Sequence, residues 1–392
     1  MPDLSVAEYD QAEQSAIATT SNRAIEAFQP FTFLKIGYPD RVRQEAELFK
    51  YIDVMHENEF EGHISEQLGG ISEPEFELVR RLTSLVCDFS EANFGKKSIP
   101  RATMLGALNV FRHIQYIFGE ARPPVFEIGP GSGYLGAMLI LEGYPYLATE
   151  VSQAFYLYQS HLWNYISGGK LLELAHPNHS VEEFAMPPPG GGVHIPWWEL
   201  VRLRPELIPD FDVVTCNRVL CEMHGQSLNF IMKITKAAMR GHDTPKAFVF
   251  NGWGSAIGTP AHSVTQAFYG AGFGLVHYDP QITVMAPQDM ECGKSCLSLP
   301  DTRLKRLLGI RLRNVFRYLT GLPPLRRDVL YGPHQYTSAS NPLSSAIMSG
   351  REAGEGTRTV GVDRLNRFYD ELVGEEDHLT PDERFQTWPG NN

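Results

Sequence analysis

The segment Val125–Glu150 constrains the fold of this chain more than any other stretch. It reads VFEIGPGSGYLGAMLILEGYPYLATE and opens with an apolar run, Val125–Ile128, that is typical of a buried strand. The turn that follows contains three glycines, Gly129, Gly131 and Gly133. Apolar residues at helical spacing then predict a helix over Tyr134–Leu141, and a second strand over Tyr146–Thr149 ends at Glu150. This order of strand, glycine turn, helix and strand predicts the half-module of a nucleotide-binding α/β fold.

Each part of this unit suits ligand binding for a physical reason. Glycines allow a sharp turn with positive φ and let a ligand approach the backbone without meeting a Cβ atom. The first turn of the following helix leaves backbone N–H groups free for polar ligand atoms. The carboxylate of Glu150, at the tip of the second strand, is suited to accept hydrogen bonds from a ribose diol.

Two cofactor families use such a turn. The segment Gly131–Gly136 matches the dinucleotide pattern G-x-G-x-x-G, which is weak support for NAD when it stands alone. A longer pattern starts with an acidic residue, Glu127, and continues with alternate glycines from Gly129. It resembles motif I of the class I S-adenosylmethionine (SAM)-dependent methyltransferases. Because an extra carboxylate suits a cationic ammonium and sulfonium better than a pyrophosphate, the sequence favours SAM over NAD, and both over a glycine turn without a ligand.

Composition and charge exclude several classes of protein. The 392 residues, 43% apolar and 20% charged, indicate an ordinary globular protein with one large domain and additions, or two domains. A net charge of −12 argues against general nucleic-acid binding. The acidic N-terminus lacks an apolar core, so we expect no signal peptide, and no apolar run is long enough to span a bilayer. Five cysteines without a framework spacing fit a reducing cytoplasm.

Residues 1 to about 120 are predicted to be mostly helical. Apolar residues at steps of three and four favour helices over Arg41–Met55, Glu73–Phe89 and Ala102–Phe118, whereas Leu4–Ala27 has only weak periodicity. Two interpretations stay open for this region. It forms a cap that packs beside the core domain or serves as a homodimer surface, or it forms a lid over the substrate.

The segment after Glu150 contains one clear helix and an ambiguous strand. Aromatic residues mark a helix over Gln153–Ile166, and such a stripe is more often core than ligand site. The third strand of the sheet is either Lys170–Ala175 or Val193–Ile195, and the sequence does not decide between them. The paired tryptophans of His194–Glu199 have two interpretations. They either stack on an adenine or on the face of a sugar, or they anchor the core at the start of a helix.

The next segments complete a sheet. Strands are predicted over Asp210–Asn217 and Lys246–Asn251, separated by an amphipathic helix over Ser227–Ala238. The first of these strands ends in polar residues at the carboxyl edge, where ligands bind in open α/β sheets. A short helix over Ser263–Tyr269 then leads to two closing strands, Gly272–Tyr278 and Ile282–Met285. A closing hairpin of this kind is how class I methyltransferases finish their seven-stranded sheet, and dinucleotide dehydrogenases usually lack it.

The C-terminal residues are additional to this core. Arg303–Leu319 is predicted to be a basic amphipathic helix, whose simplest interpretation is a solvated basic face over an apolar stripe. Its alternatives are contact with an anionic substrate or with a membrane surface. One last helix is predicted over Val362–Leu372, and Gly374–Asn392 is an acidic, loose tail.

Three motifs together carry a family resemblance over roughly residues 120–290. The glycine turn after Glu127, the carboxylate Glu150 and the strand Asp212–Asn217 look like motifs I, II and IV of class I methyltransferases. Shorter strings around Asn217–Met223, the helix Ile99–Phe118 and His-Ile-Pro-Trp-Trp resemble the sugar O-methyltransferases of bacterial glycan and natural-product pathways.

The resemblance implies a Rossmann-like α/β fold with a seven-stranded class I methyltransferase sheet. The chain then divides into a helical N-terminal cap, dimer or lid region (1–120), a SAM-binding domain (121–290) and a C-terminal extension (291–392). It also implies that the methionine part of SAM lies at Glu127, Gly129, Gly131 and Gly133. The ribose hydroxyls lie at Glu150, and Asn217 sits beside the transferring methyl group. Tyr134 stands where this family often has a different arrangement of aromatic and glycine residues, which leaves its contact with SAM open.

Methyl transfer to a hydroxyl needs a group that removes the proton from the acceptor. His224 is the first candidate base because histidine titrates near neutral pH, with Glu222 as its orienting partner or as an acceptor for a sugar hydroxyl. The alternative is that Glu222 caps the next helix and His224 lies at the surface. His262, in the loop after the fifth strand, is the second candidate base.

A metal site is not expected. Cys216, Cys221 and His224 lie close in sequence, and Cys292 and Cys296 add two thiols, but zinc sites favour tighter Cys-x-x-Cys pairs. The sequence therefore predicts a cytoplasmic SAM-dependent O-methyltransferase that acts on a small molecule, a sugar or sugar-bearing metabolite. The alternatives are methylation of a non-sugar natural product at O, N or carboxylate, an NAD-dependent oxidoreductase, and a methyltransferase-like binding subunit without catalysis.

Overall fold

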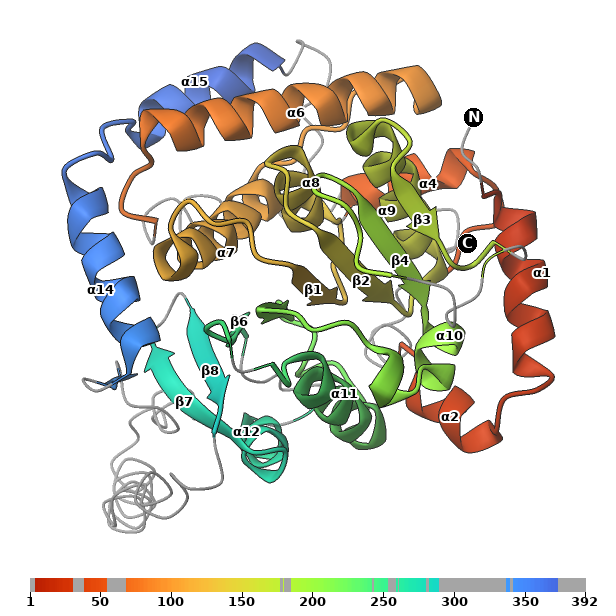
Figure 1. Ribbon diagram of the computed structural model, residues 1–392. Coiled ribbons are helices and arrows are strands. Elements are labelled where there is room, and N and C mark those ends of the chain that lie inside the picture. The colour runs from red at the N-terminus through yellow and green to blue at the C-terminus, as the bar shows by residue number, and fades with distance from the viewer. Residues whose placement is uncertain are drawn as a thin grey trace, which may run out of the picture.

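The three-dimensional structure is a computed structural model of the chain (Figure 1). It describes residues 4–30, 39–54, 68–176, 179, 185–241, 243–252, 259, 261–279, 282–288, 336–338 and 341–372.

A single mixed sheet lies at the centre of the described part of the chain. Its strand order is β3-β4-β2-β1-β5-β6-β8-β7-β9. The bounds of the strands are β1 Val125–Ile128, β2 Tyr146–Glu150, β3 Leu171–Glu173, β4 Gly192–Pro196, β5 Val213–Thr215, β6 Ala247–Phe250, β7 Phe273–Tyr278, β8 Thr283–Pro287 and β9 Tyr336–Thr337. Neighbours from β3 to β6 run parallel, whereas β8 is antiparallel to β6 and β7, and β7 is antiparallel to β9.

The central seven strands confirm the predicted fold class. The order β4-β2-β1-β5-β6-β8-β7, with its antiparallel closing hairpin, is the seven-stranded sheet that the sequence predicts. Two short strands, β3 and β9, extend it at the edges. Both candidates for the third strand are strands, but β4 pairs with β2 and β3 lies outside β4. Burial agrees with this order, because β4 is buried along its length whereas β3, at the edge, is partly exposed at two of its three residues.

Helices cover both faces of the sheet (Figure 1). On one face lie α7, α8 and α9, with α6 packed across all three, and on the other face lie α10, α11 and α12. The bounds of the helices are α1 Val6–Ile17, α2 Asn22–Ala27, α4 Ala46–Val54, α6 Glu73–Phe94, α7 Ala102–Phe118, α8 Tyr134–Leu141, α9 Gln153–Ser167, α10 Trp197–Arg202, η2 Pro205–Leu207, α11 Gly225–Ala238, α12 Ala261–Gly270, α14 Pro342–Glu355 and α15 Val362–Leu372.

Local sequence explains where these helices begin and end. Helix α6 starts with a capping box, in which Ser72 and Glu75 bond each other's backbone N–H groups, and it ends at Gly95 with φ of 71°. Helix α8 is apolar on all sides and buried from Tyr134 to Ile140, because it lies between the sheet and α6, α7 and α9. The glycine turn in front of α8 therefore joins a strand and a helix that are both buried.

The N-terminal helices pack on the body of the sheet domain. Helices α6 and α7 contact α8, and α4 and α6 contact α9, while α1 and α2 lie against α10 and α11. The division of the chain near residues 120 and 290 stays a prediction.

The paired tryptophans belong to the core. Trp197 and Trp198 are 5% and 2% exposed, and the indole Nε1 of Trp197 donates to Glu13 at 2.8 Å. Neither lines the main cavity, so their role is that of core anchors at the start of α10.

The C-terminal extension contributes two helices to the described structure. Helix α14 packs against α7 and β7, and α15 has the bounds predicted for the last helix, Val362–Leu372. The predicted basic helix Arg303–Leu319 and the tail Gly374–Asn392 lie outside the described residues. None of the described helices combines the length and the apolar character needed to cross a bilayer.

Candidate active site

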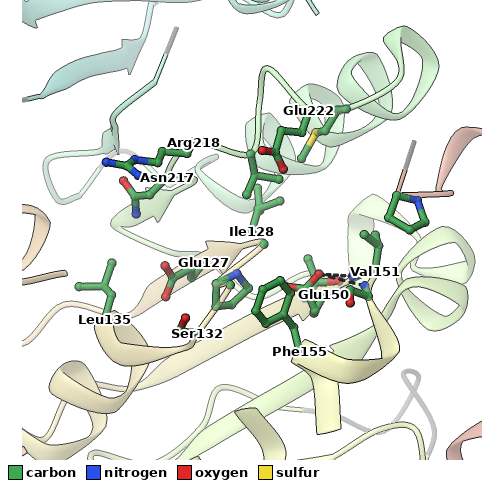
Figure 2. Close-up of a pocket in the computed structure, with 18 of the residues that line it drawn as sticks. Glu127, Ile128, Ser132, Leu135, Glu150, Val151, Phe155, Asn217, Arg218 and Glu222 are labelled. Carbon is green, nitrogen blue, oxygen red and sulfur yellow. Dashed lines mark hydrogen bonds between the residues drawn. The ribbon is translucent and has the colours of Figure 1, made fainter. Parts of the chain in front are cut away.

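The glycine turn after β1 borders a cavity of about 320 Å³ at the carboxyl ends of the strands (Figure 2). The turn, the tips of β2, β5 and β6, the N-terminal half of α7 and residues 27–30 form its wall. The polar residues in this wall are Gln29, Thr103, Glu127, Ser132, Tyr134, Thr149, Glu150, Ser152, Asn217, Arg218, Glu222, Ser227 and Asn251. Of the predicted cofactor residues, all but Gly133 line the cavity.

The three glycines of the turn have different surroundings, although each has a positive φ. A Cβ atom on Gly129 would come within 2.8 Å of Val219, and one on Gly133 would come within 3.2 Å of Gln159 and Trp163. A Cβ atom on Gly131 would meet no atom within 4 Å, although Gly131 lines the cavity. Gly131 is therefore the point at which a ligand can approach the backbone closely, whereas Gly133 is required by packing.

Glu127 is a buried carboxyl group held by two side chains. It is 2% exposed, and the hydroxyl of Tyr146 donates to its Oε2 atom at 2.7 Å. Burial raises the pKa of Glu127 to about 7, and the hydrogen bonds from Tyr146 and Asn217 limit this rise. A cationic ligand group in the cavity would favour the ionised carboxylate and bind it.

The contact between Tyr146 and Glu127 depends on Gly136. A Cβ atom on this helical glycine would overlap the hydroxyl of Tyr146, so only glycine lets the phenol reach over α8. Gly136 is the last glycine of the dinucleotide-like pattern, and its observed role is packing. Tyr146 could not be identified from the sequence, because its contact with Glu127 depends on the register of β1 and β2.

Glu150 occupies the tip of β2, as predicted. Its Oε1 atom accepts hydrogen bonds from the backbone N–H groups of Val151 at 2.8 Å and Ser152 at 3.0 Å. Burial raises the pKa of Glu150, and these hydrogen bonds oppose the rise. The close-up shows the carboxylate folded back toward Val151 at the edge of the cavity (Figure 2).

Gln159 of α9, which was not among the residues predicted from the sequence, links the glycine turn to the tip of β2. Its Nε2 atom donates to the carbonyl oxygen of Gly131 at 2.6 Å and to Oε2 of Glu150 at 3.2 Å. Gln159 is fully buried, so one amide fixes the glycine turn relative to the tip of β2. No local signal distinguishes this glutamine from other polar residues of an aromatic-rich helix.

Tyr134, the first residue of α8, lines the cavity but is bonded into the interior. Its hydroxyl lies 3.3 Å from that of Tyr158, and burial raises its pKa well above the usual range of a phenol. Tyr134 therefore supplies apolar surface to the cavity.

Two asparagines at the tips of β5 and β6 line the cavity, and each has a side-chain oxygen without a hydrogen-bond partner in the described structure. The Oδ1 atoms of Asn217 and Asn251 are buried and have no hydrogen-bond partner in the described structure. The Nδ2 atom of Asn217 donates to Thr215 Oγ1 at 2.9 Å. Buried acceptors without partners are costly in a folded protein, so these atoms indicate a ligand that brings hydrogen-bond donors.

The catalytic residues predicted from the sequence occupy different places. Glu222 lines the cavity (Figure 2), whereas His224 is exposed and caps α11, with its Nδ1 atom accepting from the backbone N–H of Gln226 at 3.3 Å. The structure thus does not bring His224 to the cavity, because α11 begins there and turns its cap toward the helix. His262 is the second residue of α12, and its side chain lies outside the described structure.

The cysteines near the site are part of the protein interior. Cys216 is buried in the strand end, and the thiol of Cys221 donates to the carbonyl of Arg218 at 2.9 Å. Burial raises the pKa of both thiols, which disfavours thiolate ligands. The described residues contain no group of three or more metal-ligating side chains, and Cys292 and Cys296 lie outside them.

Comparison with known proteins gives likeness in structure and none in sequence. No protein-family model matches the chain, and no curated protein matches its sequence. Three methyltransferases are among the solved structures that resemble part of it. A TehB-like SAM-dependent methyltransferase from Corynebacterium glutamicum is 12% identical, with a TM-score of 0.31, over 45% of this chain and 88% of that one.

The other two structures are similarly distant. A magnesium protoporphyrin IX methyltransferase from Synechocystis, with bound SAM, is 11% identical with a TM-score of 0.32, over 56% of this chain and 99% of that one. The sugar N-methyltransferase KedS8 from Streptoalloteichus is 14% identical with a TM-score of 0.30, over 47% of this chain and 87% of that one.

Proposed function

We propose that this chain is a SAM-dependent O-methyltransferase that transfers a methyl group to a hydroxyl of a sugar or of a sugar-bearing metabolite. One observation carries this proposal: Gly131, whose Cα faces open space, and Glu150 line the same cavity. Both groups stand at the carboxyl ends of adjacent parallel strands, where open α/β sheets bind their ligands.

The donor groups of the cavity suit SAM. The site offers a carboxylate at Glu150 for a ribose diol, a buried carboxylate at Glu127 for a cation, and an open backbone at Gly131. The unsatisfied oxygens of Asn217 and Asn251 suit an ammonium group or acceptor hydroxyls. A nicotinamide dinucleotide would instead set a pyrophosphate beside Glu127, where the two negative charges repel each other.

Two residues of the chain are candidates for removing the proton of the acceptor hydroxyl. SAM supplies an electrophilic methyl group when bound, and the protein aligns the acceptor and takes its proton. Glu222 lies in the wall of the cavity and follows the strand tip that carries Asn217. His262 lies in α12, and we retain it as the competing candidate.

The sugar acceptor rests on the short strings Asn217–Met223 and His194–Trp198 and on the hydroxyl-binding character of the cavity wall. A natural product without a sugar is the alternative, because the wall also contains apolar surface at Phe28, Leu200 and Met223. We place the enzyme in the cytoplasm, and we propose that the N-terminal helices serve as a cap, lid or homodimer surface.

A turnover screen tests the acceptor. The protein is incubated with SAM and with sugars, nucleotide sugars, glycosylated metabolites and sugar-free phenols and acids. Products are identified by mass spectrometry. We expect a methyl ether of a sugar-bearing compound and S-adenosylhomocysteine in equal amounts. Methylation of sugar-free compounds alone would contradict the sugar assignment, and methylation at nitrogen or carboxylate would contradict the O-methyl assignment.

A further inference from the structure

Arg218 holds an unusual backbone conformation directly at the cavity. Its φ is 63°, and among the described residues it is the only one other than glycine with a positive φ. An arginine gains nothing from this conformation, which glycine adopts without strain. Strained residues of this kind persist where the surrounding structure fixes them, and they concentrate at functional sites.

The turn around Arg218 is fixed from several sides. The N–H of Arg218 donates to the carbonyl oxygen of Asn251 at 3.0 Å, and the carbonyl oxygen of Arg218 accepts a hydrogen bond from the thiol of Cys221 at 2.9 Å. The N–H of Glu222 donates to the carbonyl of Val219 at 2.8 Å. Gly252 lies so close that a Cβ atom on it would be 2.9 Å from the Cα of Arg218.

Three polar residues of this turn line the cavity. Asn217, Arg218 and Glu222 all line it, and the close-up shows Asn217 and Arg218 together on one wall, with Glu222 further along (Figure 2). The strained position thus brings Arg218 to the same wall as Asn217, with Glu222 further along that wall.

The charge of the cavity makes this guanidinium distinctive. The described wall contains three carboxylates, Glu127, Glu150 and Glu222, and Arg218 is its only cationic side chain. The carboxylates suit hydroxyl and cationic groups, whereas a guanidinium fits a carboxylate or phosphate with two parallel hydrogen bonds. The carboxylates alone would repel an anionic acceptor, so an anionic acceptor needs a cationic side chain in the wall to bind it.

We propose that Arg218 recognises an anionic group on the acceptor, so that the methylated compound is a sugar acid or a sugar phosphate. This inference rests on the proposed function, because it assigns the acceptor of the same reaction. The strain at Arg218 is retained because this backbone position aims the guanidinium at the acceptor. The carboxylate of the methionine part of the donor is the other group that a guanidinium could bind, and the experiment separates the two.

Substitution of Arg218 by glycine separates the effect of the backbone strain from the effect of the guanidinium charge. The variant Arg218→Gly relieves the positive φ, so we expect it to melt at a higher temperature than the wild type and still lose recognition of the anion. Arg218→Lys keeps the positive charge. Arg80→Gln removes one positive charge from the exposed face of α6, away from the cavity, and serves as the matched control.

Calorimetry with defined probes supplies the measurement. Each variant is saturated with S-adenosylhomocysteine and titrated with D-glucuronate, D-glucose 6-phosphate and neutral D-glucose. In the wild type and in Arg80→Gln we expect the anionic probes to bind at least about tenfold more tightly than glucose, which corresponds to one hydrogen-bonded charge pair. Arg218→Gly should lose this preference, and Arg218→Lys should keep part of it.

Three results would overturn the inference. The assignment of Arg218 as the anion-binding residue is refuted if the wild type binds glucose and glucuronate equally. It is also refuted if Arg218→Gly still prefers the anionic probes. If Arg218→Gly weakens S-adenosylhomocysteine but not 5′-methylthioadenosine, which lacks the amino-acid part, then Arg218 binds the donor instead. Failure of the wild type to bind S-adenosylhomocysteine would refute the proposed function itself. If the wild type binds S-adenosylhomocysteine but does not prefer the anionic probes to glucose, only this inference is refuted.

Discussion

The hydrogen bond between Tyr146 and Glu127 provides a quantitative test of how the site binds a cation. Burial raises the pKa of Glu127 to about 7, and the Tyr146 hydroxyl at 2.7 Å counters part of this rise. The variant Tyr146→Phe keeps the buried ring against Trp163 and removes only the donor. A hydrogen bond to a charged group contributes about 1.5–3 kcal/mol, or about 1–2 pKa units. The pKa of Glu127 in the variant should therefore be about 8–9.

The sign of the effect follows from the charge of the ligand. The ionised carboxylate binds a cation, so the affinity for SAM should increase as pH rises through the pKa of Glu127. At pH 7 about half of the wild-type protein is ionised at this residue, against about 1–10% of the Tyr146→Phe variant. We therefore expect binding to be about 5–50-fold weaker in the variant at pH 7 and to approach that of the wild type at high pH.

The assay is a set of calorimetric titrations with SAM between pH 6 and pH 10. Glu127→Gln is the control, because it removes this titration and reports any pH dependence of the ligand's own amine. A midpoint near pH 7 in the wild type and near pH 8–9 in Tyr146→Phe is expected. Superimposable profiles for these two proteins, or a wild-type affinity as independent of pH as that of Glu127→Gln, would refute the assignment of Glu127 as the cation partner.

Three further predictions concern individual side chains. Glu222→Gln should lower kcat by about 10²–10⁴-fold and leave the SAM affinity unchanged, as expected for loss of a base. If Glu222→Gln keeps full activity and His262→Ala shows this loss instead, the base is His262. His224→Ala should lower the free energy of unfolding by about 1 kcal/mol, because it removes a helix cap, and it should keep the wild-type kcat. Denaturant unfolding measures the first effect and steady-state kinetics the second. A hundredfold loss of kcat would assign the base to His224 after all. Gln159→Met should weaken SAM binding about tenfold, because two hydrogen bonds that hold the site are lost, and unchanged binding would contradict this positioning role.

The fold was largely predictable because its signals are local. The apolar run Val125–Ile128, the helix Tyr134–Leu141 and the last helix Val362–Leu372 have in the structure the bounds that their residue patterns predict. Glycines and prolines end these elements, and the closing hairpin follows from two short apolar runs. The third strand was ambiguous because Leu171–Glu173 and Gly192–Pro196 are both short, and only pairing with β2 orders them.

The supporting contacts of the site were not predictable, because they join residues distant in sequence. The role of Gly136 depends on where the ring of Tyr146 lies, and the role of Gln159 depends on how α9 packs beside the glycine turn. His224 was chosen as base for its chemistry and its nearness to the strand end. The direction in which a helix-capping side chain turns is decided by the backbone of α11, which no residue pattern reveals.

The central claim is that the cavity between the glycine turn and Glu150 binds SAM. Calorimetric titration of the wild-type protein with SAM, S-adenosylhomocysteine and NADH tests it most directly. We predict stoichiometric binding of the first two compounds, strongly weakened in Glu150→Ala, and no binding of NADH. Binding of NADH without binding of SAM would contradict the account and would assign the glycine turn to a dinucleotide.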